Sequence, residues 1–307
     1  MMIELPEAVV ISGQIDQTLK GKRIKSAVRG NTPHKWAFYS RSARQYAALL
    51  KGKPITGAEA SGSLILIRAG SGHIVALGGG GERIEYHTSK DTVPNRHQLL
   101  LRFDDDTFLT VKVQGWGSCQ LWTPKELEGH KWYANRSLSP TEDGFTGAYF
   151  TSLFDTLKPD EARSVKYFLI TKPGVWGIGN GYLQDILLQA RLHPRTRAVD
   201  LTKAQRRTLF KAILQTVKRA VRLRGRTDEY DLFGERGRYE RVLSSSTVGK
   251  PCPQCTDAPI VKESLLGGAI YYCPKCQEPP PKPAKRRSGS ASKARKTRGP
   301  GRTADSN

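Results

Sequence analysis

The stretch CPQCTDAPIVKESLLGGAIYYCPKC, residues 252–276, decides the C-terminal part of the fold. It holds two Cys-x2-Cys pairs, Cys252 with Cys255 and Cys273 with Cys276, separated by seventeen residues. Two thiolate pairs at this spacing can close a tetrahedral four-cysteine zinc site around a β-hairpin. The sequence therefore predicts a zinc ribbon with one structural Zn²⁺.

The residues between the cysteine pairs support a hairpin. We expect residues 259–261 to form one strand, 266–269 a turn and 270–272 the returning strand. Two structural disulfides are the alternative interpretation of the four cysteines. No apolar leader precedes the fold, which favours metal-bound thiolates in a cytoplasmic, nucleoid-associated protein.

The charge balance indicates a polyanionic partner. The 307 residues contain 50 Lys+Arg against 28 Asp+Glu, a net charge of +22, which is typical of nucleic-acid-binding proteins. No apolar run approaches the roughly 20 residues of a membrane span. Residues 279–307 have no apolar periodicity and carry nine basic residues against one acidic residue. We expect a disordered tail that tethers the protein to phosphate backbones, or else a solubilising linker.

The sequence as a whole predicts an α+β protein, and its N-terminal part combines a helix with short strands. Residues 8–20 are expected to form a helix. Short apolar or alternating runs separated by Gly-rich or Asp-rich turns predict strands at 63–67, 73–77, 97–103 and 107–113. The pattern favours a β-sandwich with the N-terminal helix packed on it. Cys119, left over after the zinc ligands, is expected to be a buried, inert thiol in a strand.

The next part reads as helical. We expect a helix from Pro159 to Ile170, and Thr202-x-x-Gln205 is a capping box that opens the most strongly periodic helix in the chain. Residues 225–249 read as a linker. The predicted units are therefore 1–131, a β-sandwich; 132–224, a helical domain; 225–278, linker and ribbon; and 279–307, the basic tail.

A glycine-rich turn at residues 173–182 leads into an amphipathic helix that runs through Leu192. Free backbone N–H groups at such a helix start can hold an anion, although an ordinary helix–helix turn would look similar.

Three segments, in order, resemble the formamidopyrimidine-DNA glycosylase/endonuclease VIII family. These are Ile3-Glu4-Leu5-Pro6-Glu7 at the start, the stretch from Gly177-Ile178-Gly179-Asn180-Gly181-Tyr182 to His193-Pro194, which is similar to the family's helix-two-turn-helix, and the ribbon. The resemblance implies a monomer that binds damaged double-stranded DNA between a β-sandwich and a helical domain. It also implies a bifunctional DNA glycosylase and abasic-site lyase in base-excision repair.

In the family, the N-terminal amine, usually of a proline, attacks C1′ of the extruded damaged nucleotide and forms a Schiff base. The following Glu handles protons at the sugar. This chain keeps that acid as Glu4, an exposed residue by our expectation, but Ile3 replaces the proline. Met1 and Met2 precede it, so the resemblance implies a displaced amine at Met1 or Met2.

The resemblance also implies DNA contacts. Asn180 matches the phosphate-binding Asn, and Lys166 is either a second phosphate contact or an ordinary solvated lysine. The ribbon Arg is replaced by Gly268. Trp116 stands in the loop that carries the family's gap-filling Arg, and is either a wedge between bases or a core aromatic.

Three functional hypotheses remain open. The first is an active glycosylase or lyase, supported by Glu4 and Asn180. The second is a catalytically impaired relative that binds nucleic acid, supported by the missing proline and ribbon arginine. The third is a metal-ribbon protein of the ribosome or the transcription machinery.

Overall fold

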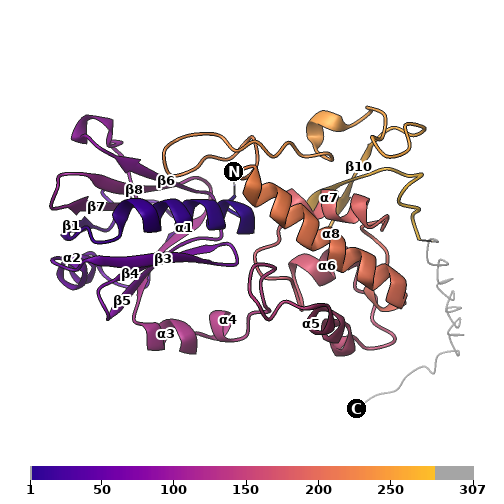
Figure 1. Cartoon of the computed structure of the whole chain (residues 1–307), viewed down its shortest axis with the longest axis horizontal. Helices are drawn as coiled ribbons and strands as arrows, with labels where there is room; N and C mark the ends of the chain where they lie inside the picture. Colours follow the sequence, from indigo (N-terminus) through magenta and orange to yellow (C-terminus); the bar gives the residue numbers. More distant parts are fainter. Residues whose placement is uncertain (1, 281–307) are drawn as a thin grey trace, which may run out of the picture.

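The computed structural model describes residues 2–280. Met1 and most of the predicted basic tail lie outside the described residues. Figure 1 shows two lobes, sheets on one side and helices on the other, with one long helix along each lobe: residues 5–19 in the sheet lobe and residues 203–222 in the helical lobe. Within residues 2–280, no helix combines the length and apolar character needed to cross a membrane.

The first lobe is the predicted β-sandwich. One sheet has the order β2 (Ala37–Phe38), β9 (Gly117–Trp122), β5 (His73–Gly78), β4 (Leu64–Ala69) and β3 (Ile55–Ser61). The other has the order β1 (Ile24–Val28), β7 (Leu99–Phe103), β8 (Phe108–Val113) and β6 (Glu82–His87). Neighbouring strands are antiparallel, except that β2 and β9 run parallel. The four strands expected from apolar alternation are confirmed, whereas β1 and β2 lie before residue 55, where none was expected.

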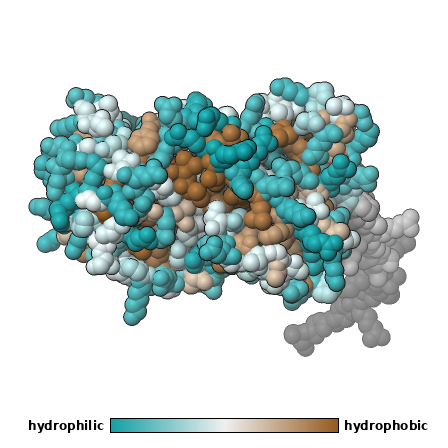
Figure 2. All heavy atoms as spheres, viewed as in Figure 1, coloured by the Kyte–Doolittle hydropathy of each residue, from teal (hydrophilic) through white to brown (hydrophobic). Residues whose placement is uncertain are grey.

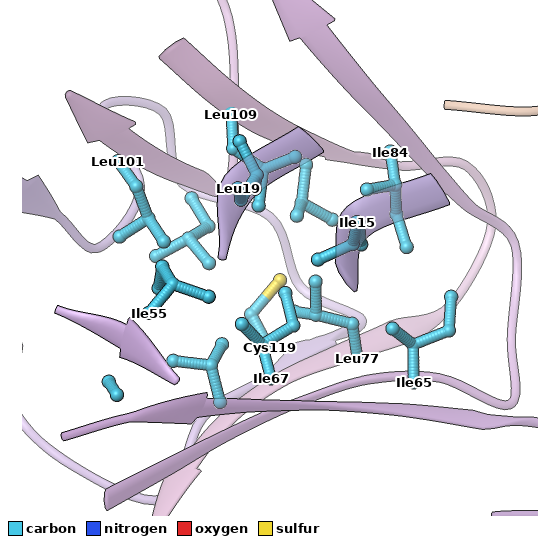
Figure 3. Close-up of a cluster of buried hydrophobic side chains, with 14 of the residues drawn as sticks. Ile15, Leu19, Ile55, Ile65, Ile67, Leu77, Ile84, Leu101, Leu109 and Cys119 are labelled. Carbon is cyan, nitrogen blue, oxygen red and sulfur yellow. The ribbon is translucent and has the colours of Figure 1, made fainter. Parts of the chain in front are cut away.

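The helix α1 (Leu5–Leu19) completes the core of this lobe. Ile15 and Leu19 pack against residues of both sheets, among them Leu101 and Ile67, as Figure 3 shows. Cys119 lies in the same core, fully buried, as predicted. Burial raises the pKa of its thiol well above the ordinary value, which keeps the thiol protonated and unreactive. A short helix, α2 (Ala43–Leu50), also contributes Tyr46.

The second lobe is helical. Its helices are α3 (Pro124–Gly129), α4 (Lys131–Ala134), α5 (Gly147–Ser152), α6 (Val165–Ile170), α7 (Asn180–Gln189) and α8 (Lys203–Arg222). The predicted capping box is present: the Thr202 hydroxyl accepts from the N–H of Gln205, whose side chain accepts from the N–H of Thr202. Figure 2 shows apolar residues gathered in the middle of the face, where the lobes meet.

Two expectations about this lobe are wrong. The helix expected from Pro159 begins only at Val165, because Ser164 caps it by accepting from the N–H of Tyr167. Residues 225–249 are not a free linker: they fold back into the molecule and bury Arg226, Leu232 and Tyr239.

The ribbon is a two-stranded hairpin, β10 (Val261–Leu265) and β11 (Gly268–Tyr272). Leu266 and Gly267 both have positive φ, which gives a two-residue turn instead of the four residues expected.

Candidate functional site

Glu4 joins the two lobes at the start of α1. Its carboxylate accepts from the backbone N–H groups of Gly179 and Gly181, both at 2.8 Å, at the first turn of α7. A helix N-terminus has free N–H donors and favours a negative charge. Only 3% of Glu4 is exposed, so the expectation of an exposed acid is wrong. A Cβ at Gly179 would lie 2.7 Å from the Glu4 carboxyl carbon, which explains a glycine at this position.

Arg226 places a buried cation among three carboxylates. Its Nη1 lies 3.0 Å from Oε1 of Glu4, its Nε lies 3.3 Å from Oε1 of Glu7, and its Nη2 lies 3.5 Å from Oε1 of Glu229. Tyr182 also donates to Glu7 at 2.6 Å. Burial raises the pKa of Glu4, and the nearby Glu7 adds to the rise, while Arg226 opposes it. Burial raises the pKa of Glu229 to about 7.

The N-terminal segment is fixed by the same cluster. The N–H of Met2 donates to Glu229 at 2.8 Å, and Arg226 donates to the Met2 carbonyl. The N–H of Ile3 donates to the carbonyl of Gly80 at 2.9 Å, and the Ile3 side chain is buried. The nitrogen of Ile3 is therefore a peptide amide, whose delocalised lone pair makes it a poor nucleophile.

A cavity of about 390 Å³ opens beside this segment. Met2, Ile3, Glu4, Ser63, Gly79, Trp132, Arg136 and Trp176 are among the residues that line it. Trp132 and Trp176 stack with ring centroids 6.3 Å apart. Gly179, which binds Glu4, also lines the cavity and precedes Asn180, so the cavity is continuous with the start of α7.

Lys166 and Asn180 converge on the ribbon hairpin. Nζ of Lys166 donates to the carbonyl of Leu265 at 3.0 Å, and Nδ2 of Asn180 donates to the carbonyl of Ala269 at 3.2 Å. Only 2% of Lys166 is exposed, so an ordinary solvated lysine is excluded, and burial lowers its pKa. A Cβ at Gly268 would lie 3.3 Å from Nζ. The ammonium group therefore lies beside the position where the ribbon lacks an arginine.

The four ribbon cysteines are brought together as free thiols, which argues against two disulfides. Their Sγ atoms all lie within 4.8 Å of one another. The Sγ atoms of Cys252 and Cys276 are 3.8 Å apart, and those of Cys255 and Cys273 are 3.6 Å apart. Zinc–sulfur bonds of about 2.3 Å in a tetrahedron require sulfur atoms about 3.8 Å apart, so the donor set fits Zn²⁺.

Trp116 lies on the surface of the sheet lobe. It is 49% exposed, so the alternative of a core aromatic is wrong. Sequence reasoning missed Arg226 and Glu229 altogether. Their only signal was the density of charge in residues 226–231, which also suits a solvated turn.

Comparisons with known proteins cover both lobes. The family described as "Formamidopyrimidine-DNA glycosylase N-terminal domain" matches residues 2–118. The family described as "Formamidopyrimidine-DNA glycosylase H2TH domain" matches residues 138–230.

Curated relatives and solved structures agree with these matches. The formamidopyrimidine-DNA glycosylase of Enterococcus faecalis is 28% identical over 288 residues, which span 90% of this chain and 98% of that protein. The one from Bacillus licheniformis is 28% identical over 282 residues, 90% and 100% of the two chains. A solved complex of the Lactococcus lactis Fpg with DNA containing an abasic site has a TM-score of 0.79 at 21% identity, covering 90% and 100%, and shows a shared fold.

Proposed function

Because the chain belongs to the formamidopyrimidine-DNA glycosylase family, we propose that it is a DNA repair glycosylase that binds damaged double-stranded DNA. The relatives from Enterococcus faecalis and Bacillus licheniformis are both named formamidopyrimidine-DNA glycosylase, which is the name of a DNA repair enzyme. The observation that carries the proposal is the meeting of the N-terminal segment, the buried Glu4 and the start of α7 at one cavity. The family assignment also removes the hypothesis of a ribosomal or transcriptional ribbon protein.

DNA phosphates bind along the surface next to this cavity. Asn180, at the positive end of α7, supplies a donor, and the ammonium group of Lys166, buried under the ribbon hairpin, adds a positive charge close behind it. Four cysteines hold one Zn²⁺, which when bound fixes the hairpin against these two side chains. Trp116 contacts bases from the sheet lobe.

The proposed chemistry starts from the α-amine of Met1 or Met2. The amine nitrogen forms a bond to C1′ of an abasic-site aldehyde, and water leaves to give a Schiff base. Loss of a proton from C2′ then breaks the bond between C3′ and its oxygen and releases the 3′ strand. Glu4 accepts that proton through Oε2, which accepts a hydrogen bond from the N–H of Gly179, whereas Oε1 accepts from both Gly181 and the positively charged Arg226.

A specific observation favours a second candidate, a catalytically impaired relative that only binds DNA. The nitrogen of Ile3 is a peptide amide bound to Gly80, so the amine is displaced along the chain. A displacement of one residue, up to about 3.5 Å, removes much of the advantage of a positioned nucleophile.

Borohydride trapping on duplex DNA with an abasic site separates the two candidates. The glycosylase proposal expects a covalent adduct at the N-terminal peptide, located by mass spectrometry, and no adduct after the amine is blocked by acetylation. Glu4→Gln should abolish strand cleavage while the variant still binds the duplex. An adduct on an internal lysine would contradict the proposed nucleophile. Binding without cleavage or trapping would establish the DNA-binding relative.

A further inference from the structure

The helix α8 carries a dense positive charge along the surface of the helical lobe (Figure 1). Residues 201–225 contain eight lysines and arginines and no aspartate or glutamate. Five of the exposed cations lie on one side of the helix, within an arc of about 100° at 3.6 residues per turn. They are Lys203, Arg207, Lys211, Lys218 and Arg222. We call these five residues the basic stripe.

The basic stripe faces away from the helical core. The buried side of α8 lies about half a turn around the helix from the stripe. On that buried side, Leu209 and Ile213 share a core with Leu183 and Leu187 of α7. Asn180, the proposed phosphate contact, stands at the start of α7. The basic stripe is therefore a surface separate from the one that carries Asn180.

The charge of the basic stripe is not neutralised by carboxylates among residues 2–280. None of its five cations forms an ion pair there, whereas the neighbouring Arg224 pairs with Asp231. Like charges four residues apart, such as Lys203 and Arg207, destabilise a helix. A cation in the first turn also opposes the helix dipole. The stripe therefore lowers the stability of α8 in the free protein, and a bound polyanion would relieve this repulsion.

The shape of the basic stripe suits the phosphate backbone of a nucleic acid. From residue 203 to residue 222 the helix rises about 28 Å, the length of about eight phosphates along one strand of a duplex. Stripe cations four residues apart are separated by about 6 Å along the helix axis. A membrane surface fits less well, because the apolar side of α8 is buried in the helical core and has no freedom to insert into lipid.

We propose that the basic stripe binds the phosphate backbone of a second DNA duplex while a damaged duplex occupies the surface next to the cavity. Contacts from lysine and arginine to phosphate carry no sequence information, so the second site accepts undamaged DNA of any sequence. The protein thereby bridges two DNA segments. This inference rests on the proposed function, since it requires that damaged DNA binds beside the cavity.

The test measures whether one protein molecule holds two duplexes at once. An immobilised duplex containing a tetrahydrofuran residue, an abasic-site analogue, is saturated with the full-length protein and washed. A fluorescent undamaged duplex is then added at low salt, and the wild type should retain it. A stripe variant that combines Arg207→Gln, Lys211→Gln and Lys218→Gln should bind the second duplex at least about tenfold more weakly, with a salt slope lower by about three. Glutamine is a good helix former, so α8 should persist.

Two further variants are the controls. Arg44→Gln, Lys51→Gln and Lys53→Gln together remove one exposed arginine and two exposed lysines from the sheet lobe, which matches the charge lost in the stripe variant. A second control exchanges the cations of the stripe and keeps their charge: Arg207→Lys, Lys211→Arg and Lys218→Arg. Both should retain the undamaged duplex as the wild type does. All variants should keep their affinity for the tetrahydrofuran duplex, which also shows that they are folded.

Several outcomes overturn the second site. Equal retention by the stripe variant and the wild type would assign the second duplex to another part of the chain, and equal loss in the sheet-lobe control would reduce the effect to net charge. Two protein chains per bridged complex in mass photometry would attribute the bridge to a dimer. Loss of both duplexes by a stripe variant with an unchanged circular dichroism spectrum would place the stripe in the lesion-binding surface.

The wild type separates this inference from the proposed function. If it binds the tetrahydrofuran duplex and retains no second duplex, the inference is wrong and the proposed function stands. If it binds neither duplex, both are wrong.

Discussion

Arg226 donates to Glu4 at 3.0 Å from a position 222 residues further along the chain. Neither side chain is more than 4% exposed. The acid that the family resemblance assigns to proton transfer is therefore also half of a buried ion pair. Removing one partner of such a pair leaves an uncompensated charge in the interior, so the cluster links the folding of the protein to the chemistry of its site.

Arg226→Ala should lower the free energy of unfolding by about 3–5 kcal/mol, since three carboxylates lose their shared cation. Urea unfolding followed by circular dichroism measures the change. Arg224→Ala is the control: Arg224 pairs with Asp231 but is 44% exposed, and its loss should cost at most about 1 kcal/mol. Equal effects of the two substitutions would contradict the role of the buried cluster.

The buried Glu82 should make stability depend on pH. Its carboxylate accepts from the N–H groups of Gly80 and Ser118, yet burial raises its pKa from 4.5 to about 7. Because the pKa of Glu82 is higher in the folded than in the unfolded state, protonation of this carboxyl group favours folding. This stabilisation is complete below pH 4.5 and is lost as the pH rises through about 7. The free energy of unfolding of the wild type, measured relative to Glu82→Gln, should therefore fall by about 3 kcal/mol over this window. Parallel pH profiles would refute the assignment.

Freshly purified protein should contain one zinc per chain, because the sulfur separations fit a tetrahedral site. Elemental analysis by mass spectrometry should show loss of the metal in Cys276→Ser and retention in Cys119→Ala, whose thiol lies in the other core. Removing zinc with a chelator should also weaken DNA binding, since the hairpin that contacts Lys166 and Asn180 depends on the metal for its folding. Metal-free protein with full DNA affinity would argue against this dependence.

Lys166→Met and Asn180→Ala should weaken binding to abasic-site duplexes, while exposed Lys172→Ala should have a small effect. Because Lys166 contributes a positive charge beside the bound phosphate, its replacement should also reduce the slope of log K against log salt by about 1. Fluorescence anisotropy at several salt concentrations measures both quantities. An unchanged slope in Lys166→Met would place the phosphate contact elsewhere.

The sequence predicted those structural elements that short-range sequence patterns determine. Cysteine spacing identified the ribbon, the capping box placed the start of α8, and apolar alternation located β4, β5, β7 and β8. It did not predict contacts between distant segments. Arg226 lies in a stretch of turn-forming composition, and nothing nearby reveals that it enters a buried cluster with Glu4 and Glu7. The exposure of Trp116 was likewise undetermined, because it depends on what packs beside the start of β9.

The position of Glu4 also determines whether the two lobes can fold as separate fragments. By chain connectivity, the lobes separate near residues 132–140. The first seven residues, however, place two carboxylates under α7 and the loop after α8, where their donors are Gly179, Gly181, Tyr182 and Arg226. A fragment containing only the sandwich would expose those acids without these donors, and a fragment containing only the helices would retain Arg226 with Glu229 but without Glu4 and Glu7. The cooperative folding unit is therefore the whole of both lobes, whatever the order of their segments along the chain.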